Sequence, residues 1–339
     1  MALVNINLHS TPRSRIILLF GALIAAAALT GLLALASGSV PVPLREVLGI
    51  MVESAPGVNA QIVLELRLPR VISGFAVGGM LALAGVLMQI LLRNPLAEPY
   101  ILGVSGGASV FALLAISIGL AGIWLTLGAC FGALLTMFMV FVCSGSSAGW
   151  NPLRVLLTGV VIAAGWGAVI SFLLAVSPAA RLHNMLFWLM GDLSFSQSGG
   201  WYYLLLLLAL LPAMYYARAL NVLAGGDLQA AALGVSVNRV RVITYFLASI
   251  LTATAVIQAG SIGFIGLIVP HGMRLLIGAD NRLLMPASVL AGGILLVFAD
   301  MLARALLAPR QLPVGVLTAL IGVPVFLLLL RSAGARQRS

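Results

Sequence analysis

Long apolar runs, with charged residues mainly between them, are the dominant pattern of this chain. A helix needs about 20 mostly apolar residues to cross the ~30 Å hydrocarbon core of a bilayer. Ten runs approach or exceed that length, and they cover approximately residues 16–36, 71–92, 100–119, 121–143, 153–176, 201–217, 242–260, 262–278, 284–307 and 313–330. The pattern predicts an all-α polytopic membrane protein with about ten transmembrane helices.

Some stretches depart from a plain succession of spans. The eighth run begins "GSIGFIGLIVPHG", whose glycines and Pro270 favour a broken or re-entrant start. Residues 37–68 and 177–200 are long enough to be more than turns between spans. The second of them carries an apolar helical stripe at Leu182, Met185, Leu186 and Leu189. We expect a short interfacial helix there.

The first run also has features of a secretory signal peptide, since Arg13 and Arg15 precede it and small residues follow at 34–37. Its apolar part, about eighteen residues, is longer than the usual signal core. We interpret it as an uncleaved span. The chain is then a single transmembrane domain, residues 1–339, with a tail at 1–15, a helical bundle at 16–330 and a tail at 331–339.

Composition agrees with a membrane protein and narrows its chemistry. Hydrophobic residues make up 62% of the 339 residues and charged residues 8%, with a mean hydropathy of +1.17, whereas soluble domains carry about 25% charged residues. All 18 basic residues are arginine. The lack of lysine excludes a G-x-x-x-x-G-K-[ST] phosphate loop and Schiff-base catalysis. If ATP drives this protein, another chain hydrolyses it.

Other ligand classes find little support. The formal charge of +10 does not indicate a nucleic-acid partner, because the arginines are scattered between apolar runs. Cys130 and Cys143 would lie about 20 Å apart on one helix, too far for a disulfide or a shared metal. His183 and His271 each lack a second ligand at metal spacing. We expect no metal, no cofactor and no catalytic residue.

The arginine positions predict the orientation. With ten spans and an inside N-terminus, twelve arginines lie inside and six outside, which is the bias of the positive-inside rule. Both termini are therefore expected in the cytoplasm. The outer six are Arg45, Arg67, Arg70, Arg181, Arg304 and Arg310. Two of them bracket Pro69 in "RLPR", on the side where that rule places few positive charges.

Several stretches are candidates for contact surfaces. A stripe of small residues at 74–85 favours close helix packing, with a translocation path as the alternative. "RNPLAEPY" at 93–100 predicts a rigid polar turn. The longest inner loop, residues 225–241, contains a short helical stretch in which Asp227 is a suitable N-terminal cap. An exposed short helix there would suit a soluble partner.

Asp300 and Arg304 are four residues apart on one predicted helix face. Such a pair can neutralise itself, although a proton-relay role for Asp300 is the alternative. That alternative corresponds to an ion-coupled secondary transporter. A membrane enzyme or a scaffold is less favoured, because the sequence has no cluster of His, Asp and Glu at catalytic spacing.

Together these stretches resemble the FecCD family of ABC-importer permeases, the membrane subunits that carry iron chelates (siderophores, haem) and cobalamin. The matching pieces run in family order over about residues 60–330 and are "RLPR", "RNPLAEPYILGVSGGA", "GDLQAAALGV", "GSIGFIGLIVPHGMRLL" and "ADMLAR...LPVGVLTALIGVPVFLLLL". The resemblance implies a type II ABC importer permease fold and a homodimer with the substrate path on its axis. It also implies two cytoplasmic ABC ATPase subunits, a periplasmic or surface substrate-binding protein, membrane lipid around the bundle, and a bacterial inner membrane.

The resemblance further assigns roles to residues on the predicted outer side. Arg67, Arg70 and Arg304 match arginines that face acidic residues on the two lobes of the binding protein. Carboxylate pairing would explain arginines retained on that side; anchoring of helix ends to lipid headgroups is the alternative. The family usually has an acidic residue before "LPVG", where this chain has Gln311, so the local pairing there stays open.

On the predicted inner side the resemblance implies two functional segments. The coupling helix that would contact the ATPase includes Asp227, Ala230, Leu233 and Gly234. The cytoplasmic gate would include Asn94, Pro95 and Leu96, with a further constriction at Asn151 and Pro152. The resemblance leaves the substrate open among ferric siderophores, haem and cobalamin, with ferric chelates slightly favoured.

Overall fold

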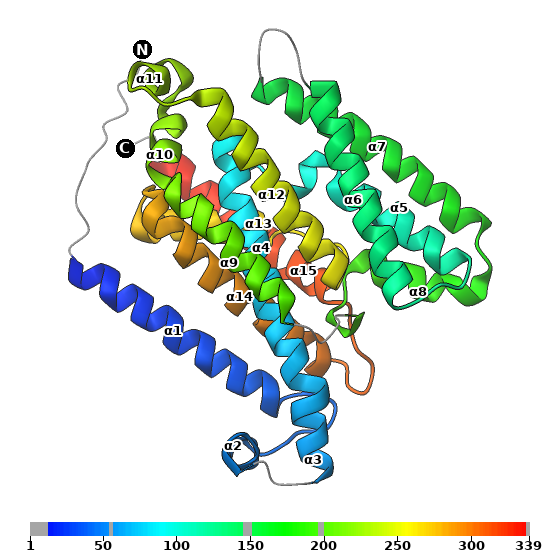
Figure 1. The fold of residues 1–339 in the computed structure, drawn as a ribbon. Helices are drawn as coiled ribbons and strands as arrows, with labels where there is room; N and C mark the ends of the chain where they lie inside the picture. The colour runs from blue at the N-terminus through cyan, green and yellow to red at the C-terminus, as the bar shows by residue number, and fades with distance from the viewer. Residues whose placement is uncertain (1–12, 54–56, 145–150, 196–199, 337–339) are drawn as a thin grey trace.

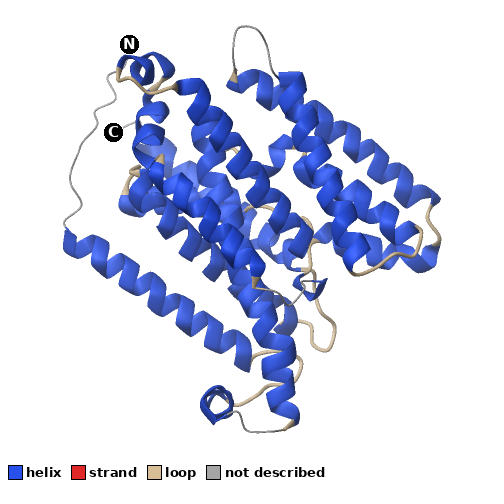
Figure 2. Ribbon diagram, in the orientation of Figure 1, coloured by secondary structure: helices blue, strands red, loops and turns tan. Residues whose placement is uncertain are grey.

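The computed structural model describes residues 13–53, 57–144, 151–195 and 200–336. Within these ranges every regular element is a helix and no strand is found, as Figure 2 shows. The predicted all-α class is confirmed. The tail residues 1–12 and 337–339 lie outside the described ranges, and α15 continues through residue 336 of the predicted C-terminal tail.

Six elements are membrane-length helices, namely α1 (Arg13–Ala36), α4 (Leu68–Leu91), α6 (Ile123–Ser144), α7 (Pro152–Val176), α12 (Val237–Ala259) and α14 (Asn281–Ala305). The other α-helices are α2 (Leu44–Glu53), α3 (Val58–Gln61), α5 (Val104–Ser117), α8 (Ala179–Met190), α9 (Trp201–Tyr215), α10 (Ala217–Gly225), α11 (Asp227–Ala232), α13 (Ile265–Ile277) and α15 (Val314–Arg336). A π-helical turn, η1 (Ile62–Arg67), leads directly into α4, and short 3₁₀ turns form η2 (Pro99–Leu102) and η3 (Leu193–Phe195).

Helix α4 is the centre of the bundle, and nearly all of it from residue 73 onward is buried. It packs against α12, α13 and α14 (Figure 1). A Cβ atom on Gly78 would lie 2.2 Å from the Gly292 carbonyl oxygen, and one on Gly85 would lie 2.0 Å from the Gly266 carbonyl oxygen. The backbones touch only because these residues have no side chain. The small-residue stripe is therefore a helix-packing surface, as predicted.

A second group of helices, α5 to α8, lies beside this central group (Figure 1). Helix α5 packs on α6 and α7, and α6 also contacts α12. Large apolar side chains of α7, including Val161 and Phe172, are exposed in the single chain. Helix α8 occupies the segment where the sequence predicted a short interfacial helix, and it buries Met185 while Leu186 stays exposed.

The ten predicted apolar runs each coincide with helix. The run predicted at 201–217 coincides with α9, and α10 follows it at an angle of 59°, a bend that the sequence did not indicate. Apolarity predicts burial in lipid and says nothing about direction. The bend is held by contacts from distant residues: the Asn221 side-chain amide donates to Asp280 (2.7 Å), and the Asn281 N–H donates to the Asn221 side-chain oxygen (2.8 Å).

The predicted broken start of the eighth run is confirmed, since α13 begins only at Ile265 after non-helical residues 260–264. Two side chains next to η2 satisfy the backbone donors that the break leaves free. The Glu98 carboxylate accepts from the Phe264 N–H (2.6 Å), and the Tyr100 hydroxyl accepts from the Ile262 N–H (2.9 Å). Burial raises the pKa of Glu98 above its usual range, against the lowering effect of the Phe264 N–H.

Candidate functional site

The two ends of the bundle each carry a cluster of arginine and aspartate. We name them by their helices: the α2 end contains α2, η1 and residues 37–43, and the α11 end contains α11, the turn at 92–98 and residues 278–280 (Figure 1). Helix α4 runs from the first end to the second. The sequence-predicted docking residues lie at the α2 end, and the coupling and first gate segments lie at the α11 end.

At the α2 end, three helices bring Arg67, Arg70 and Arg304 together. Arg67 is the last residue of η1, Arg70 lies in the first turn of α4, and Arg304 lies in the last turn of α14. The first two are three positions apart and so share a helix face. All three are buried in the chain, in spite of their charge.

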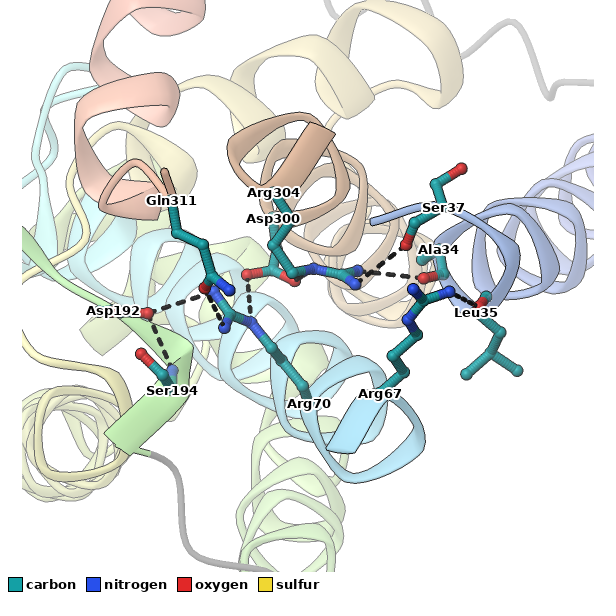
Figure 3. Close-up of polar contacts among 10 residues, drawn as sticks. All are labelled: Ala34, Leu35, Ser37, Arg67, Arg70, Asp192, Ser194, Asp300, Arg304 and Gln311. Atoms are coloured by element: carbon teal, nitrogen blue, oxygen red, sulfur yellow. Dashed lines mark hydrogen bonds and ion pairs between the residues drawn. The ribbon is translucent and has the colours of Figure 1, made fainter. Parts of the chain in front are cut away.

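Arg70 has a partner for each of its guanidinium nitrogens (Figure 3). Its Nε donates to Asp300 Oδ1 (2.8 Å), its Nη2 to Asp192 Oδ1 (3.2 Å), and its Nη1 to Gln311 Oε1 (3.1 Å). These partners come from α14, from the segment after α8 and from the residues before α15. A buried charge is tolerated only when it is paired and hydrogen-bonded, and Arg70 meets that condition by joining three segments.

Arg304 and Arg67 use the end of α1 as their acceptor. Arg304 Nε pairs with Asp300 Oδ2 at 3.0 Å, which confirms the predicted pair, while its other nitrogens donate to the carbonyls of Ala34 (3.1 Å) and Ser37 (3.2 Å). Arg67 donates to the carbonyls of Leu35 (2.7 Å) and Ala36 (3.1 Å), and also to that of Val40 in the segment after α1. The last four carbonyls of a helix lack intrahelical partners and carry partial negative charge, so the end of α1 suits two guanidinium groups.

This group, which we call the arginine cluster, keeps an excess of positive charge. It contains three guanidinium groups but only the carboxylates of Asp192 and Asp300. A cavity of about 230 Å³ opens beside it, lined by all three arginines, Gln311 and neighbours at 38–40, 62 and 66. The combination of excess positive charge and a side-chain-sized cavity suits one or two carboxylate groups from outside the chain.

The structure therefore brings the three predicted docking arginines into one place but also supplies counter-charges that sequence reasoning missed. Asp192 and Gln311 were not recognised as partners of Arg70. They lie 122 and 241 positions from it in the chain, so no local spacing signals the contact. Gln311 occupies the position where an acidic residue was expected, and its amide oxygen still accepts from Arg70.

At the α11 end, Asp227 is the centre of the second cluster. Arg241 Nη2 lies 2.6 and 2.7 Å from its two carboxylate oxygens, and Arg93 also pairs with it. The prediction that Asp227 caps α11 was wrong, because the capping position is Gly226 and no side chain caps the helix. The carboxylate is instead drawn to two arginines from α12 and from the end of α4. Burial and the Arg241 charge lower the pKa of Arg93.

The remaining predicted coupling residues differ in exposure. Ala230 is buried against the bundle, whereas Leu233 is 65% exposed and Gly234, just after the helix, has φ +78°. Leu228, which the sequence analysis did not single out, is 90% exposed. Two exposed leucines, one on α11 and one at the residue after it, therefore lie on the short segment that begins with Asp227.

The predicted gate residues have defined local roles. The Asn94 side chain accepts from the Leu96 N–H (2.9 Å) and rigidifies the turn, while Pro95 and Leu96 are exposed. Asn151 caps α7 by accepting from the Leu153 N–H (2.9 Å), with Pro152 in the first turn. Figure 1 shows the start of α7 at the same end of the molecule as α11.

Within the described ranges, no group of three or more His, Cys, Asp or Glu side chains is placed to hold a metal ion. His183 stacks on Phe187, with ring centroids 4.4 Å apart, and Cys130 and Cys143 are free. The arginine cluster therefore lies at the α2 end of the helical bundle, and the Asp227 cluster with the exposed Leu228 and Leu233 lies at the α11 end. That arrangement suits a protein that binds partners on both sides of a membrane.

Comparison with known proteins agrees with this arrangement. Residues 14–332 match the FecCD transport family. The chain is 41% identical over 285 residues to the cobalamin import system permease protein BtuC of Halobacterium salinarum, covering 82% of this chain and 76% of the relative. It is 42% identical over 286 residues to the hemin transport system permease protein HmuU of Yersinia pestis, covering 81% and 84%.

A solved structure shares the whole fold. It is described as a metal-chelate type ABC transporter in an inward-facing conformation, and it superposes with a TM-score of 0.82 at 31% identity, covering 93% of this chain and 99% of the other.

Proposed function

Because the chain belongs to the FecCD transport family, we propose that it works as a homodimer that receives a ferric chelate from an acidic binding protein at the arginine cluster. The chain is a multi-pass, non-catalytic permease subunit of an ABC importer for iron chelates, haem or cobalamin. Such an importer also contains ATPase and binding-protein partners.

The arginine cluster supports the docking proposal. Its net positive charge and its 230 Å³ cavity lie at the α2 end, where no described carboxylate beyond Asp192 and Asp300 reaches the arginines. Acidic side chains of the binding protein would enter this cavity and pair with Arg67, Arg70 and Arg304. Complementary charge speeds encounter and selects the partner. This end would then face the periplasm or cell surface.

The α11 end supports the proposal for the ATPase. Exposed Leu228 and Leu233 would fill an apolar groove on the ATPase, and the ion pairs of Asp227 would transmit movement of α11 to α4 and α12. The gate at 94–96 is joined to this unit through Arg93. Closure of two ATPases on ATP would then move the inner ends of both copies. Both termini would be cytoplasmic.

The substrate proposal is supported by the likeness to a metal-chelate type transporter over nearly the whole chain. A path on the dimer axis needs no fixed ligand set, because selection would occur in the binding protein. The alternative, a proton-coupled secondary transporter, finds less support: both oxygens of Asp300, its one candidate proton site, are engaged by guanidinium groups.

The single observation that carries the docking proposal is the cavity lined by three arginines, and reconstituted ATPase activity tests it. The permease, its ATPase and its binding protein are placed in liposomes, and stimulation by binding protein is compared between wild type and Arg67→Glu. We expect the binding-protein concentration for half-stimulation to rise at least about tenfold, since losing an interfacial charge pair costs on the order of 2–5 kcal/mol and about 1.4 kcal/mol is tenfold.

Two controls make the result interpretable. Arg45→Glu reverses an exposed arginine of α2 that does not line the cavity and should leave stimulation unchanged. Basal ATPase activity reports whether Arg67→Glu still folds and assembles. If basal activity is normal and stimulation is also normal, the arginine cluster is not the docking site. The same liposomes loaded with cobalamin, haem or a ferric siderophore through the binding protein identify the substrate.

A further inference from the structure

The cavity at the first half of α1 is separate from both charged clusters. It has a volume of about 680 Å³ and lies between α1 and the last turns of α13. Figure 1 shows α1 running along the edge of the bundle rather than inside it. The main contact of α1 is with α14, and none of its residues from 14 to 33 is buried. A long groove therefore remains between α1 and α13.

The lining of this groove is apolar except at one end. Its α1 wall includes Leu19, Ala22 and Ala26, and its α13 wall includes Met273 and Leu276. Arg15, which also lines it, is the single charged residue among the lining side chains. An apolar cavity of this size does not hold stably bound water, and it opens where the chain meets lipid.

The length of the groove matches one leaflet. From Arg15 to Ala26 is eleven residues of continuous helix, or about 16 Å at 1.5 Å per residue. Half of a hydrocarbon core of ~30 Å is about 15 Å. Arg15 would therefore lie at headgroup level while the groove extends to the middle of the membrane.

We infer that this groove is a binding site for an anionic phospholipid of the leaflet in which Arg15 lies. Its acyl chains would fill the apolar groove between α1 and α13, and its phosphate would pair with the Arg15 guanidinium. Arginine suits this role because its planar fork binds phosphate through two parallel hydrogen bonds. Neither the Arg15 charge alone nor the apolar groove alone would select an anionic phospholipid. The two together do so, because the groove extends from Arg15 by about the thickness of one leaflet.

The site has a structural consequence for the other end of α1. Lipid in the groove fixes α1 against the bundle, and the last carbonyls of α1 are the acceptors for Arg67 and Arg304. An occupied groove therefore helps to hold the arginine cluster in place. This inference depends only on α1, α13 and the membrane, and is independent of the proposed docking partner.

Native mass spectrometry and thermal unfolding of the delipidated full chain in mild detergent test the site. The chain is titrated with phosphatidylglycerol, phosphatidylcholine or inorganic phosphate. We expect phosphatidylglycerol to be retained and to raise the unfolding temperature, phosphatidylcholine to bind at least about tenfold more weakly, which corresponds to about 1.4 kcal/mol, and phosphate to have no effect.

Two variants and two matched controls locate the binding. Arg15→Glu should remove the preference for phosphatidylglycerol, whereas Arg239→Glu, an exposed arginine that does not line the groove, should keep it. Ala22→Trp should fill the groove and abolish retention, whereas Ala28→Trp, an exposed position outside the lining, should not.

Three results would overturn the inference. Equal binding of both lipids by wild type would remove the role of charge, and unchanged binding by Ala22→Trp would place the lipid elsewhere. Efficient cross-linking between copies through Ala22→Cys, in a chain with Cys130 and Cys143 replaced by serine, would show that a second copy covers the groove.

Discussion

Two clusters of arginine and aspartate lie at opposite ends of α4 and differ in burial. The arginine cluster and the Asp227 cluster are separated by the length of that helix, 24 residues or about 36 Å at 1.5 Å per residue. In the first, the Arg70 and Asp300 side chains are 10% and 2% exposed. In the second, Arg93 and Asp227 are 36% and 42% exposed, although Arg241 is only 4% exposed.

The difference in burial gives the two Arg–Asp clusters different energetic roles. In the buried cluster each charge must be compensated, because removing one partner leaves the other in a medium of low dielectric constant. In the Arg93–Asp227 pair water compensates a lost partner, so that pair adds little stability. We therefore expect loss of the buried carboxylates at the α2 end to affect folding and loss of Asp227 at the α11 end to affect coupling.

The largest effect is expected for Asp300→Ala. The change leaves both Arg70 and Arg304 without their shared carboxylate, and removing one partner from a buried pair costs about 3–5 kcal/mol. Thermal unfolding in detergent should show a strongly lowered midpoint, with Glu65→Ala, an exposed carboxylate of η1, as the control. Equal midpoints for Asp300→Ala and Asp227→Ala would show that burial does not distinguish the clusters.

A smaller loss is expected for Asp192→Ala. Arg70 keeps Asp300 and Gln311, but its buried Nη2 loses the Asp192 acceptor (3.2 Å), and an unsatisfied buried donor costs about 1–3 kcal/mol. Asp192→Asn, which keeps an acceptor oxygen, should lose less. The same unfolding measurement ranks the variants, and a loss for Asp192→Ala greater than that for Asp300→Ala would contradict the assignment of Asp300 as the main counter-charge.

For Asp227→Ala we expect a stability loss of about 1 kcal/mol, the upper end for exposed pairs, because the half-exposed carboxylate pairs with the exposed Arg93 but also with the buried Arg241. Transport driven by ATP should nevertheless fall sharply, because α11 loses its connection to α4 and α12. The two readouts are unfolding temperature and substrate uptake into liposomes. Raising the salt concentration should weaken the contribution of the Arg93–Asp227 pair to the stability of wild type. A large loss of stability with normal uptake for Asp227→Ala would contradict a coupling role for this cluster.

Glu98 adds a third case, a largely buried carboxylate whose partner is the Phe264 N–H rather than an arginine. Its pKa is raised, so its stabilising contribution is fully present below the unfolded pKa and is lost as pH rises through the folded pKa. Glu98→Gln keeps the acceptor oxygen and removes the charge. Relative to wild type, the variant should gain stability as pH increases from 5 to 8. A pH-independent difference between the two unfolding midpoints would argue against this shift.

Much of the architecture follows from local pattern. The predicted apolar runs coincide with helices, the glycines before α13 identified its broken start, and the pair Asp300 and Arg304 followed from helical spacing alone. These features depend on residues close together in the chain, where the geometry of a helix is known in advance. The family resemblance then selected the three arginines and the α11 segment.

The partners of those residues were decided by tertiary structure. The contacts of Arg70 with Asp192 and Gln311, of Asp227 with Arg93, and of α10 with Asp280 join segments from 59 to 241 positions apart. Polar side chains inside a bundle must find partners, but the sequence does not say which helices will be neighbours. The sequence by itself determined a helical membrane permease and the residues that carry its charges; only the packed bundle decided which charges are buried together and which remain exposed, because burial depends on helices that meet in space.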